Sequence, residues 1–138
     1  MTSTVFVDTS ALYAVLDRDD ANHSTAASAW AKIFDGIEAG MTDATTHSGV
    51  LIETTALVQR RLGMEAVRAL HHRLVPVLDV YWLDQRLHEQ AVTALLAADR
   101  RDLSLVDWAS FEVMRREGID VALAFDDDFV ARGFALFE

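Results

Sequence analysis

The sequence predicts an α/β fold built around a mostly parallel β-sheet. Short apolar runs that suit buried strands alternate along the chain with longer stretches that have the apolar spacing of helices. The chain has 138 residues, 51% of them hydrophobic, which is enough to fill one core. No repeat, linker or low-complexity segment interrupts residues 1–138. We therefore expect a single domain.

The first half of the chain predicts strands and helices in alternation. Residues 5–7 form the first expected strand, and Thr9 or Ser10 is expected to cap the helix that follows. Gly40 and Gly63 are the expected ends of the next two helices, because glycine readily adopts the left-handed backbone found there. The other expected elements are a polar loop at 17–22, a helix at 24–37, a short strand at 41–44 and a helix at 47–62.

The second half repeats this alternation. A helix at 64–74 is expected to stop before Pro76, the only proline, and a strand at 77–82 is expected to follow it. Ser104 is expected to cap a helix that ends at Gly118. The other expected elements are a helix at 87–98, a charged loop at 99–102, a buried strand at 119–125, a short helix or turn, and a final apolar segment at 134–137.

The amino-acid composition excludes some kinds of site and argues against others. The chain has no cysteine, which excludes disulfides and thiolate metal ligands. It shows no basic leader and no apolar run long enough for a membrane span, so we expect a soluble cytoplasmic protein with no membrane partner. The net charge of −10 repels phosphodiesters unless cations or local arginines reverse the field. The basic residues are eleven arginines and Lys32, a bias that suits phosphate contacts but that a GC-rich genome would also produce.

Four acidic residues are candidate metal ligands. Asp8 and Asp126 each follow an apolar strand, and α/β sheets bind ligands at the carboxyl ends of their strands. Asp107 lies in the first turn of the helix expected to start at Ser104. Glu53 interrupts an apolar helix face, where a buried carboxylate needs a cation or an arginine partner. Singly, each acid could instead be a helix cap, a turn or an ion-pair residue, but together at one sheet edge carboxylates select a hard cation such as Mg2+.

The five histidines do not have the spacing of a zinc site. His71 and His72 are adjacent, so they point in different directions on a helix, and His23, His47 and His88 are scattered along the chain. We expect the histidines to have surface roles.

Several segments of the sequence follow one another in a recognisable order. They are VFVDTSAL (5–12), DANH (20–23), the stretch 45–63 around Glu53, the stretch 103–119 around Asp107, and AFDDDF (124–129). Together they resemble the PIN domain, and specifically the toxin ribonucleases of VapBC toxin–antitoxin systems, over nearly the whole chain. The last segment departs from the family, because Asp127 and Asp128 stand where the family often has a basic residue or a histidine. Those two residues could also form a solvated acidic turn.

The resemblance implies a three-layer α/β/α sandwich with one or two Mg2+ or Mn2+ ions. It implies an endoribonuclease, the toxin of a type II toxin–antitoxin system, that hydrolyses RNA phosphodiesters with metal-activated water and no protein nucleophile. The residues that the resemblance makes metal ligands and catalytic groups are Asp8, Glu53, Asp107 and Asp126.

The resemblance also suggests supporting residues and partners. Ser10 and Ser104 are candidates for orienting carboxylates or water, and Arg100 and Arg101 for binding RNA phosphates, with surface solubility as the alternative for the arginines. The family implies a small VapB-like antitoxin that blocks the site, and a homodimer built from helices.

Three other functions remain open at this point. A catalytically silent PIN-like module that only binds a partner would keep the same fold. A Mg2+-dependent phosphatase would use Asp8 as its nucleophile, although the paired acid of such enzymes is missing, since Thr9 and Ser10 follow. A receiver-like signalling module would need a lysine late in the chain, whereas Lys32 lies early.

Overall fold

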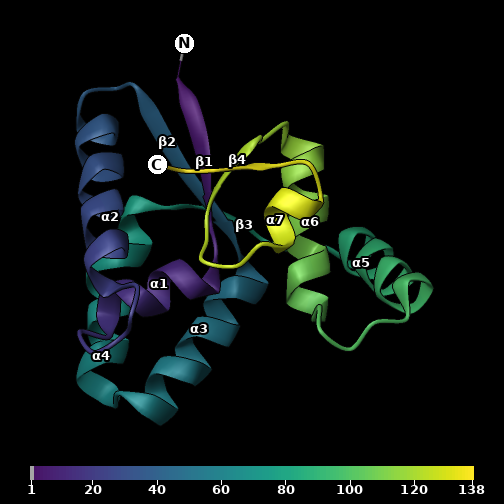
Figure 1. Cartoon of the computed structure of the whole chain (residues 1–138), viewed down its shortest axis with the longest axis horizontal. Helices are drawn as coiled ribbons and strands as arrows, with labels where there is room; N and C mark the ends of the chain where they lie inside the picture. The colour runs from purple at the N-terminus through teal and green to yellow at the C-terminus, as the bar shows by residue number, and fades with distance from the viewer. Residues whose placement is uncertain (1) are drawn as a thin grey trace.

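A five-stranded parallel sheet forms the centre of the computed structural model, which describes residues 2–138 (Figure 1). The strands lie in the order β3-β2-β1-β4-β5, which places β3 and β5 at the edges of the sheet. These two edge strands are short, with three and two residues respectively. The strands are β1 (Ser3–Val7), β2 (Thr42–His47), β3 (Asp79–Tyr81), β4 (Val121–Leu123) and β5 (Ala135–Leu136). The expected α/β class with a parallel sheet is confirmed.

Helices cover both faces of the sheet and complete the expected three-layer sandwich. Figure 1 shows α2 on one side of the strands and α5, α6 and α7 on the other, while α1 and α3 extend from the edge at which β1 and β2 end. Within residues 2–138, no helix combines the length and the apolar character needed to cross a membrane. The helices are α1 (Thr9–Leu16), α2 (His23–Glu38), α3 (Ser48–Arg61), α4 (Met64–Ala69), α5 (Gln85–Ala98), α6 (Leu105–Glu117) and α7 (Asp128–Ala131).

The sheet has a topological switch point between the neighbouring strands β1 and β4. Strands β2 and β3 are added on one side of β1, whereas β4 and β5 lie on the other side. The connections therefore diverge at the carboxyl ends of β1 and β4, where sheets of this kind bind ligands. Hydrogen bonds continue to this edge: the Asp8 amide donates to the Leu123 carbonyl (3.1 Å), and the Thr46 hydroxyl donates to the Val7 carbonyl (2.8 Å).

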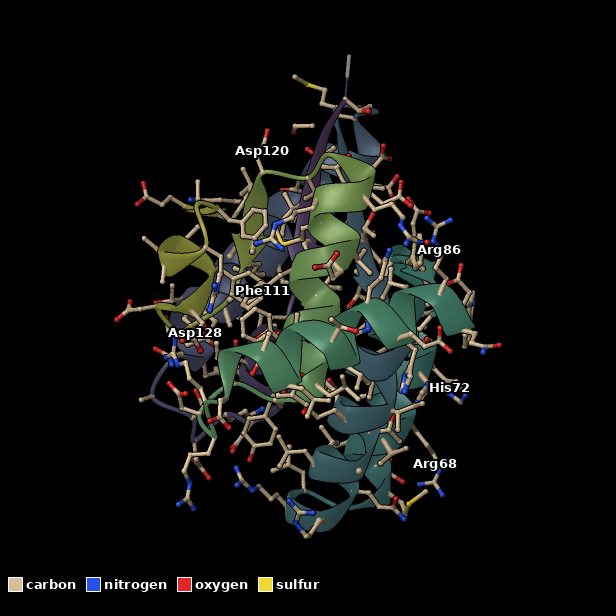
Figure 2. All side chains as sticks on the ribbon, turned by 90° about the vertical axis from the view of Figure 1, so that its right-hand side faces the viewer. Arg68, His72, Arg86, Phe111, Asp120 and Asp128 are labelled. Carbon is tan, nitrogen blue, oxygen red and sulfur yellow. The ribbon has the colours of Figure 1, made fainter. Side chains whose placement is uncertain are left out.

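Aromatic packing holds α6 and α7 against the sheet. Phe6 of β1, Phe111 of α6 and Phe129 of α7 are completely buried. The ring centroids of Phe111 and Phe129 are 5.2 Å apart in an edge-to-face arrangement, and those of Phe6 and Phe129 are 6.1 Å apart. Figure 2 shows Phe111 between α6 and the α7 segment that carries Asp128. The core thereby fixes the two helices that supply acidic residues to the same sheet edge.

Some element boundaries differ from the expected ones. The cap of α1 is Asp8 rather than Thr9 or Ser10, because a carboxylate that leaves the strand can accept the hydrogen bond from the Ser10 amide. The expected helix at 64–74 widens after α4 into a π-helical turn before Pro76, which lacks the amide that a regular helix would use. The strands also have other limits than expected: β1 is at 3–7 rather than 5–7, β2 at 42–47 rather than 41–44, β3 at 79–81 rather than 77–82, and β4 at 121–123 rather than 119–125.

Candidate active site

Asp8 lies at the carboxyl end of β1 and is only 4% exposed. Its Oδ2 accepts hydrogen bonds from the Ser10 amide (3.3 Å) and from the Ser10 hydroxyl (2.8 Å). The Ser10 hydroxyl also accepts a hydrogen bond from the Phe125 amide (3.1 Å), one residue before Asp126. Ser10 therefore orients the Asp8 carboxylate and links it to the segment that follows β4.

Asp107 reaches the same edge from the first turn of α6. Ser104 caps this helix in a capping box: the Ser104 hydroxyl accepts from the Asp107 amide (3.2 Å), and Asp107 Oδ2 accepts from the Ser104 amide (2.8 Å). The Ser104 hydroxyl also lies 3.1 Å from the same carboxylate oxygen. The expected cap is thus confirmed, and it holds the Asp107 side chain in one orientation.

Asp126 lies in the turn between β4 and α7. Its Oδ1 accepts a hydrogen bond from the Asp128 amide (3.1 Å), and its side chain is half-buried. Asp128 is half-buried as well, and its charge raises the pKa of both Asp107 and Asp126. Asp127 is exposed. The charge of Asp127 raises the pKa of Asp126 only, so of the two extra acids Asp128 is the one whose charge acts on both Asp107 and Asp126.

Asp8, Asp107 and Asp126 share one feature of their hydrogen bonding. In each, one carboxylate oxygen is held by a residue two or three positions away along the chain. Throughout residues 2–138, no hydrogen bond or ion pair engages the other oxygen of these side chains. Each aspartate is therefore oriented by local bonds and still has an oxygen that can contact a ligand.

The three aspartates lie close enough to affect one another's ionisation. Burial raises the pKa of Asp8 to about 7, the hydrogen bonds from Ser10 oppose this shift, and the charges of Asp126 and Asp107 add to it. The pKa values of Asp107 and Asp126 are also raised, mainly by burial. Carboxylates that are partly desolvated and repel one another are stabilised by a nearby cation.

The residues at this edge fit a hard divalent cation. As the side chains stand, no three Asp, Glu or His residues within 2–138 form a ready-made metal cluster, so ligation requires side-chain rotation. The available donors are oxygens, the ligands that Mg2+ and Mn2+ prefer. Three polar atoms remain buried without a partner within the described chain, the hydroxyls of Thr9 and Thr54 and the indole nitrogen of Trp108, and each directly follows a predicted ligand. Buried polar groups without a partner are uncommon in folded proteins, and a bound water or ion is one way in which they are satisfied.

Glu53 does not have the environment expected from its position in the sequence. It is half-exposed on α3 instead of buried in an apolar face, and within residues 2–138 no arginine forms an ion pair with it. The difference arises because the buried face of α3 runs through Val50, Thr54 and Val58, and Glu53 lies at the edge of that face. Glu53 lines a cavity of about 410 Å3 together with Leu105 and Val106, the two residues before Asp107. Glu53 therefore borders the first turn of α6, which carries Asp107.

Arg100 and Arg101, the two candidates for binding RNA phosphates, have different surroundings. Arg100 forms an exposed ion pair with Asp102, with contacts of 2.6 and 3.0 Å, and the charge of Asp128 also acts on it. Arg101 is exposed, and within the part of the chain that the structure describes it has no ion-pair partner. Exposed ion pairs contribute little to stability, so both guanidinium groups can be redirected toward phosphate.

One histidine is buried, contrary to expectation. His47 has no exposed surface, and it ends β2 next to α3. Burial lowers its pKa to about 4, so it is neutral at physiological pH. The apolar spacing of 47–62 places a helix there but does not show that the residue before it faces the core.

Comparison with known proteins identifies the family of the chain. The family model described as the PIN domain matches residues 5–135. The 23S rRNA-specific endonuclease VapC20 of two Mycobacterium tuberculosis strains is 42% identical over 131 residues, which covers 94% of this chain and 95% of that protein.

Solved structures show the same architecture. The crystal structure of M. tuberculosis VapC20, titled a sarcin-ricin loop cleaving toxin, has a TM-score of 0.81 and 40% identity, and covers 95% of this chain and 96% of that one. FitAcB from Neisseria gonorrhoeae has a TM-score of 0.66 at 14% identity, covering 97% and 96% of the two chains. VapBC2 from Rickettsia felis, bound to a promoter DNA fragment, has a TM-score of 0.68 at 11% identity, covering 96% of each chain, and these two weaker identities show the fold alone. The chain belongs to the PIN-domain family, among its VapC-like members.

Proposed function

We propose that the chain is a Mg2+- or Mn2+-dependent endoribonuclease that acts as the toxin of a toxin–antitoxin pair. The observation that carries this proposal is the convergence of Asp8, Asp107 and Asp126 at the switch point of the sheet, each with one oriented and one available carboxylate oxygen. A cation held there would neutralise phosphate charge and activate water. The similarity to an endonuclease over 94% of the chain supports the same chemistry.

The chain's own residues would perform the other tasks. Ser10 and the capping box at Ser104 would orient one oxygen of Asp8 and of Asp107, which limits the adjustment that binding a cation requires. Glu53 would complete the ligand set from α3 after a change of side-chain rotamer. Arg100 and Arg101 would attract the RNA backbone to an otherwise acidic surface.

We further propose that the substrate is the sarcin-ricin loop of 23S rRNA. The relative that shares 42% of its residues is named a 23S rRNA-specific endonuclease, and its crystal structure is titled as that of a sarcin-ricin loop cleaving toxin. A folded RNA loop with unstacked bases is also the kind of RNA that proteins distinguish best.

Cleavage mapping on ribosomes tests this proposal. The purified chain, incubated with 70S ribosomes and Mg2+ or Mn2+, is expected to make one cut in the sarcin-ricin loop, detected by primer extension, and EDTA is expected to prevent it. Cleavage at another RNA would refute the substrate assignment alone. Cleavage that persists in EDTA would refute the metal dependence, and no cleavage of any RNA would favour the partner-binding alternative.

We also propose that a basic segment of a VapB-like antitoxin occupies the acidic edge. An arginine can pair with carboxylates through two parallel hydrogen bonds and would lower the repulsion among Asp8, Asp107 and Asp126. The net charge of −10 favours association with such a basic partner.

The proposed homodimer would use an apolar surface on α3. Ile52 and Trp82 are each 72% exposed. Ile52 lines both the cavity beside Glu53 and an adjoining cavity of about 460 Å3 that Trp82 also lines. A second copy of the chain would cover this surface, because large exposed apolar groups that lie together usually mark an interface.

Replacing Ile52 with Asp is expected to convert a dimer into a monomer, since it places a charge at the centre of this surface. Light scattering coupled to size exclusion measures the mass. The matched control is Leu96→Asp, because Leu96 is 71% exposed on α5 away from both cavities. A monomeric wild type, or an Ile52→Asp variant that remains dimeric, would refute this interface.

A further inference from the structure

A buried histidine connects the two helices that carry Glu53 and Asp107. His47 caps α3, because its Nδ1 accepts hydrogen bonds from the amides of Gly49 (3.0 Å) and Val50 (3.2 Å). On the other side of the ring, Nε2 lies 2.9 Å from the hydroxyl oxygen of Ser110 in α6. The imidazole therefore touches both helices at once.

The hydrogen bonds determine where the protons are. Since Nδ1 accepts from two backbone amides, it carries no proton, and the neutral ring must carry its proton on Nε2. Nε2 then donates to the Ser110 hydroxyl, which donates in turn to the Val106 carbonyl (2.9 Å). Each polar atom in this series of hydrogen bonds has a partner, and only one placement of the protons satisfies all of them. The connection between the two helices is therefore rigid.

The connection lies one helical turn from the predicted ligands. Ser110 is three residues after Asp107, so the two occupy neighbouring positions on α6. Glu53 lies on α3, which begins directly after His47. Within residues 2–138, no other side chain forms hydrogen bonds to both α3 and α6. His47 is also the last residue of β2, the strand paired with β1. It therefore connects both helices to the strand that Asp8 follows.

We propose that His47 is a positioning residue that, through Ser110, sets the placement of Glu53 relative to Asp107 and thereby the affinity of the site for its divalent ion. This inference rests on the proposed metal-dependent function. Residues that orient ligands typically change metal affinity or activity by about 10- to 100-fold when they are replaced. Breaking the connection is expected to have an effect of that order without unfolding the chain.

Two substitutions test the hydrogen bond between His47 and Ser110 separately from the cap that His47 provides for α3. His47→Asn keeps an acceptor near the Nδ1 position for the cap of α3 but is too short to reach Ser110. Ser110→Ala breaks the link from the α6 side and leaves the cap intact. The matched control is Thr93→Ala, because Thr93 makes the same type of bond to a carbonyl four residues earlier, at an exposed position of α5.

The test measures Mn2+ binding by electron paramagnetic resonance, together with the Mn2+ dependence of RNA cleavage and the melting temperature. His47→Asn and Ser110→Ala are each expected to raise the Mn2+ dissociation constant about 10-fold or more, and the double variant to be no worse than either. Thr93→Ala is expected to bind Mn2+ like the wild type.

The possible results distinguish a failure of this inference from a failure of the proposed metal-dependent function. If the wild type binds Mn2+ and Ser110→Ala binds it equally well, with or without a lower melting temperature, His47 and Ser110 only stabilise the fold and the inference is wrong. If the wild type binds no Mn2+, the metal-dependent function is itself wrong, and the positioning role is overturned with it.

Discussion

RNA cleavage by Asp8→Asn and by Asp107→Asn is expected to fall about 100-fold or more, because each change removes a carboxylate charge that would hold the cation. Both variants are expected to stay folded. Asparagine is a good helix cap, and its side-chain oxygen can accept the bond that Asp8 accepts from the Ser10 amide or that Asp107 accepts from the Ser104 amide.

The rate of cleavage of the sarcin-ricin loop RNA under saturating Mn2+ measures this effect. Asp19→Asn is the matched control, since it removes an equal charge from the exposed loop before α2. The site is wrongly assigned if the two variants cleave RNA within about threefold of the wild-type rate, a difference of less than about 1 kcal/mol.

The same Asp8→Asn change is expected to stabilise the metal-free chain at alkaline pH. The pKa of Asp8 is about 7 in the folded chain, against 3.8 for an ordinary aspartate. Above pH 7 the folded chain therefore keeps an ionised carboxylate in a buried position, at a cost of up to about 4 kcal/mol of unfolding free energy. As the pH falls from 7 to 4, the folded chain binds a proton that the unfolded chain does not, and this penalty disappears.

His47 acts in the opposite direction over an overlapping range. Its pKa is about 4 in the folded chain, against 6.5 for an ordinary histidine. As the pH falls from 6.5 to 4, the unfolded chain binds the proton first, so up to about 3 kcal/mol of unfolding free energy is lost. In the wild type, the two groups offset one another below pH 6.5.

Urea unfolding across this pH range therefore gives a specific pattern. The wild type is expected to change little, whereas Asp8→Asn is expected to be more stable near pH 8 and to lose stability on acidification. Mn2+ is expected to raise the unfolding free energy of the wild type and not that of Asp8→Asn. An Asp8→Asn variant that is less stable than the wild type at about pH 8 would contradict the assigned burial of this charge.

The local parts of the fold and the site could be predicted from the sequence. Asp8 follows an apolar strand, and Ser104 stands three residues before Asp107, which is the spacing of a capping box. Both signals come from neighbouring residues, so they do not depend on how distant segments pack.

The parts that could not be predicted depend on contacts between distant segments. His47 is buried because α6 packs over the end of β2, and its partner Ser110 is 63 positions away. Likewise, the three consecutive aspartates look equivalent in the sequence, and only the turn into α7 directs Asp128 toward Asp107. The exposure of Glu53 depends on which side of α3 the other elements cover, and the apolar periodicity of the segment does not define the edge of that covered face.

The shortness of β3 and β5 has a consequence for how the chain behaves at high concentration. An edge strand offers unpaired backbone groups as a template for other chains, and a long flat edge promotes uncontrolled polymerisation. With three residues at one edge and two at the other, this sheet offers little such template. Self-association must then depend on side-chain surfaces, which a single substitution can switch off. The folded chain can therefore reach high concentrations without growing into fibres through its sheet edges.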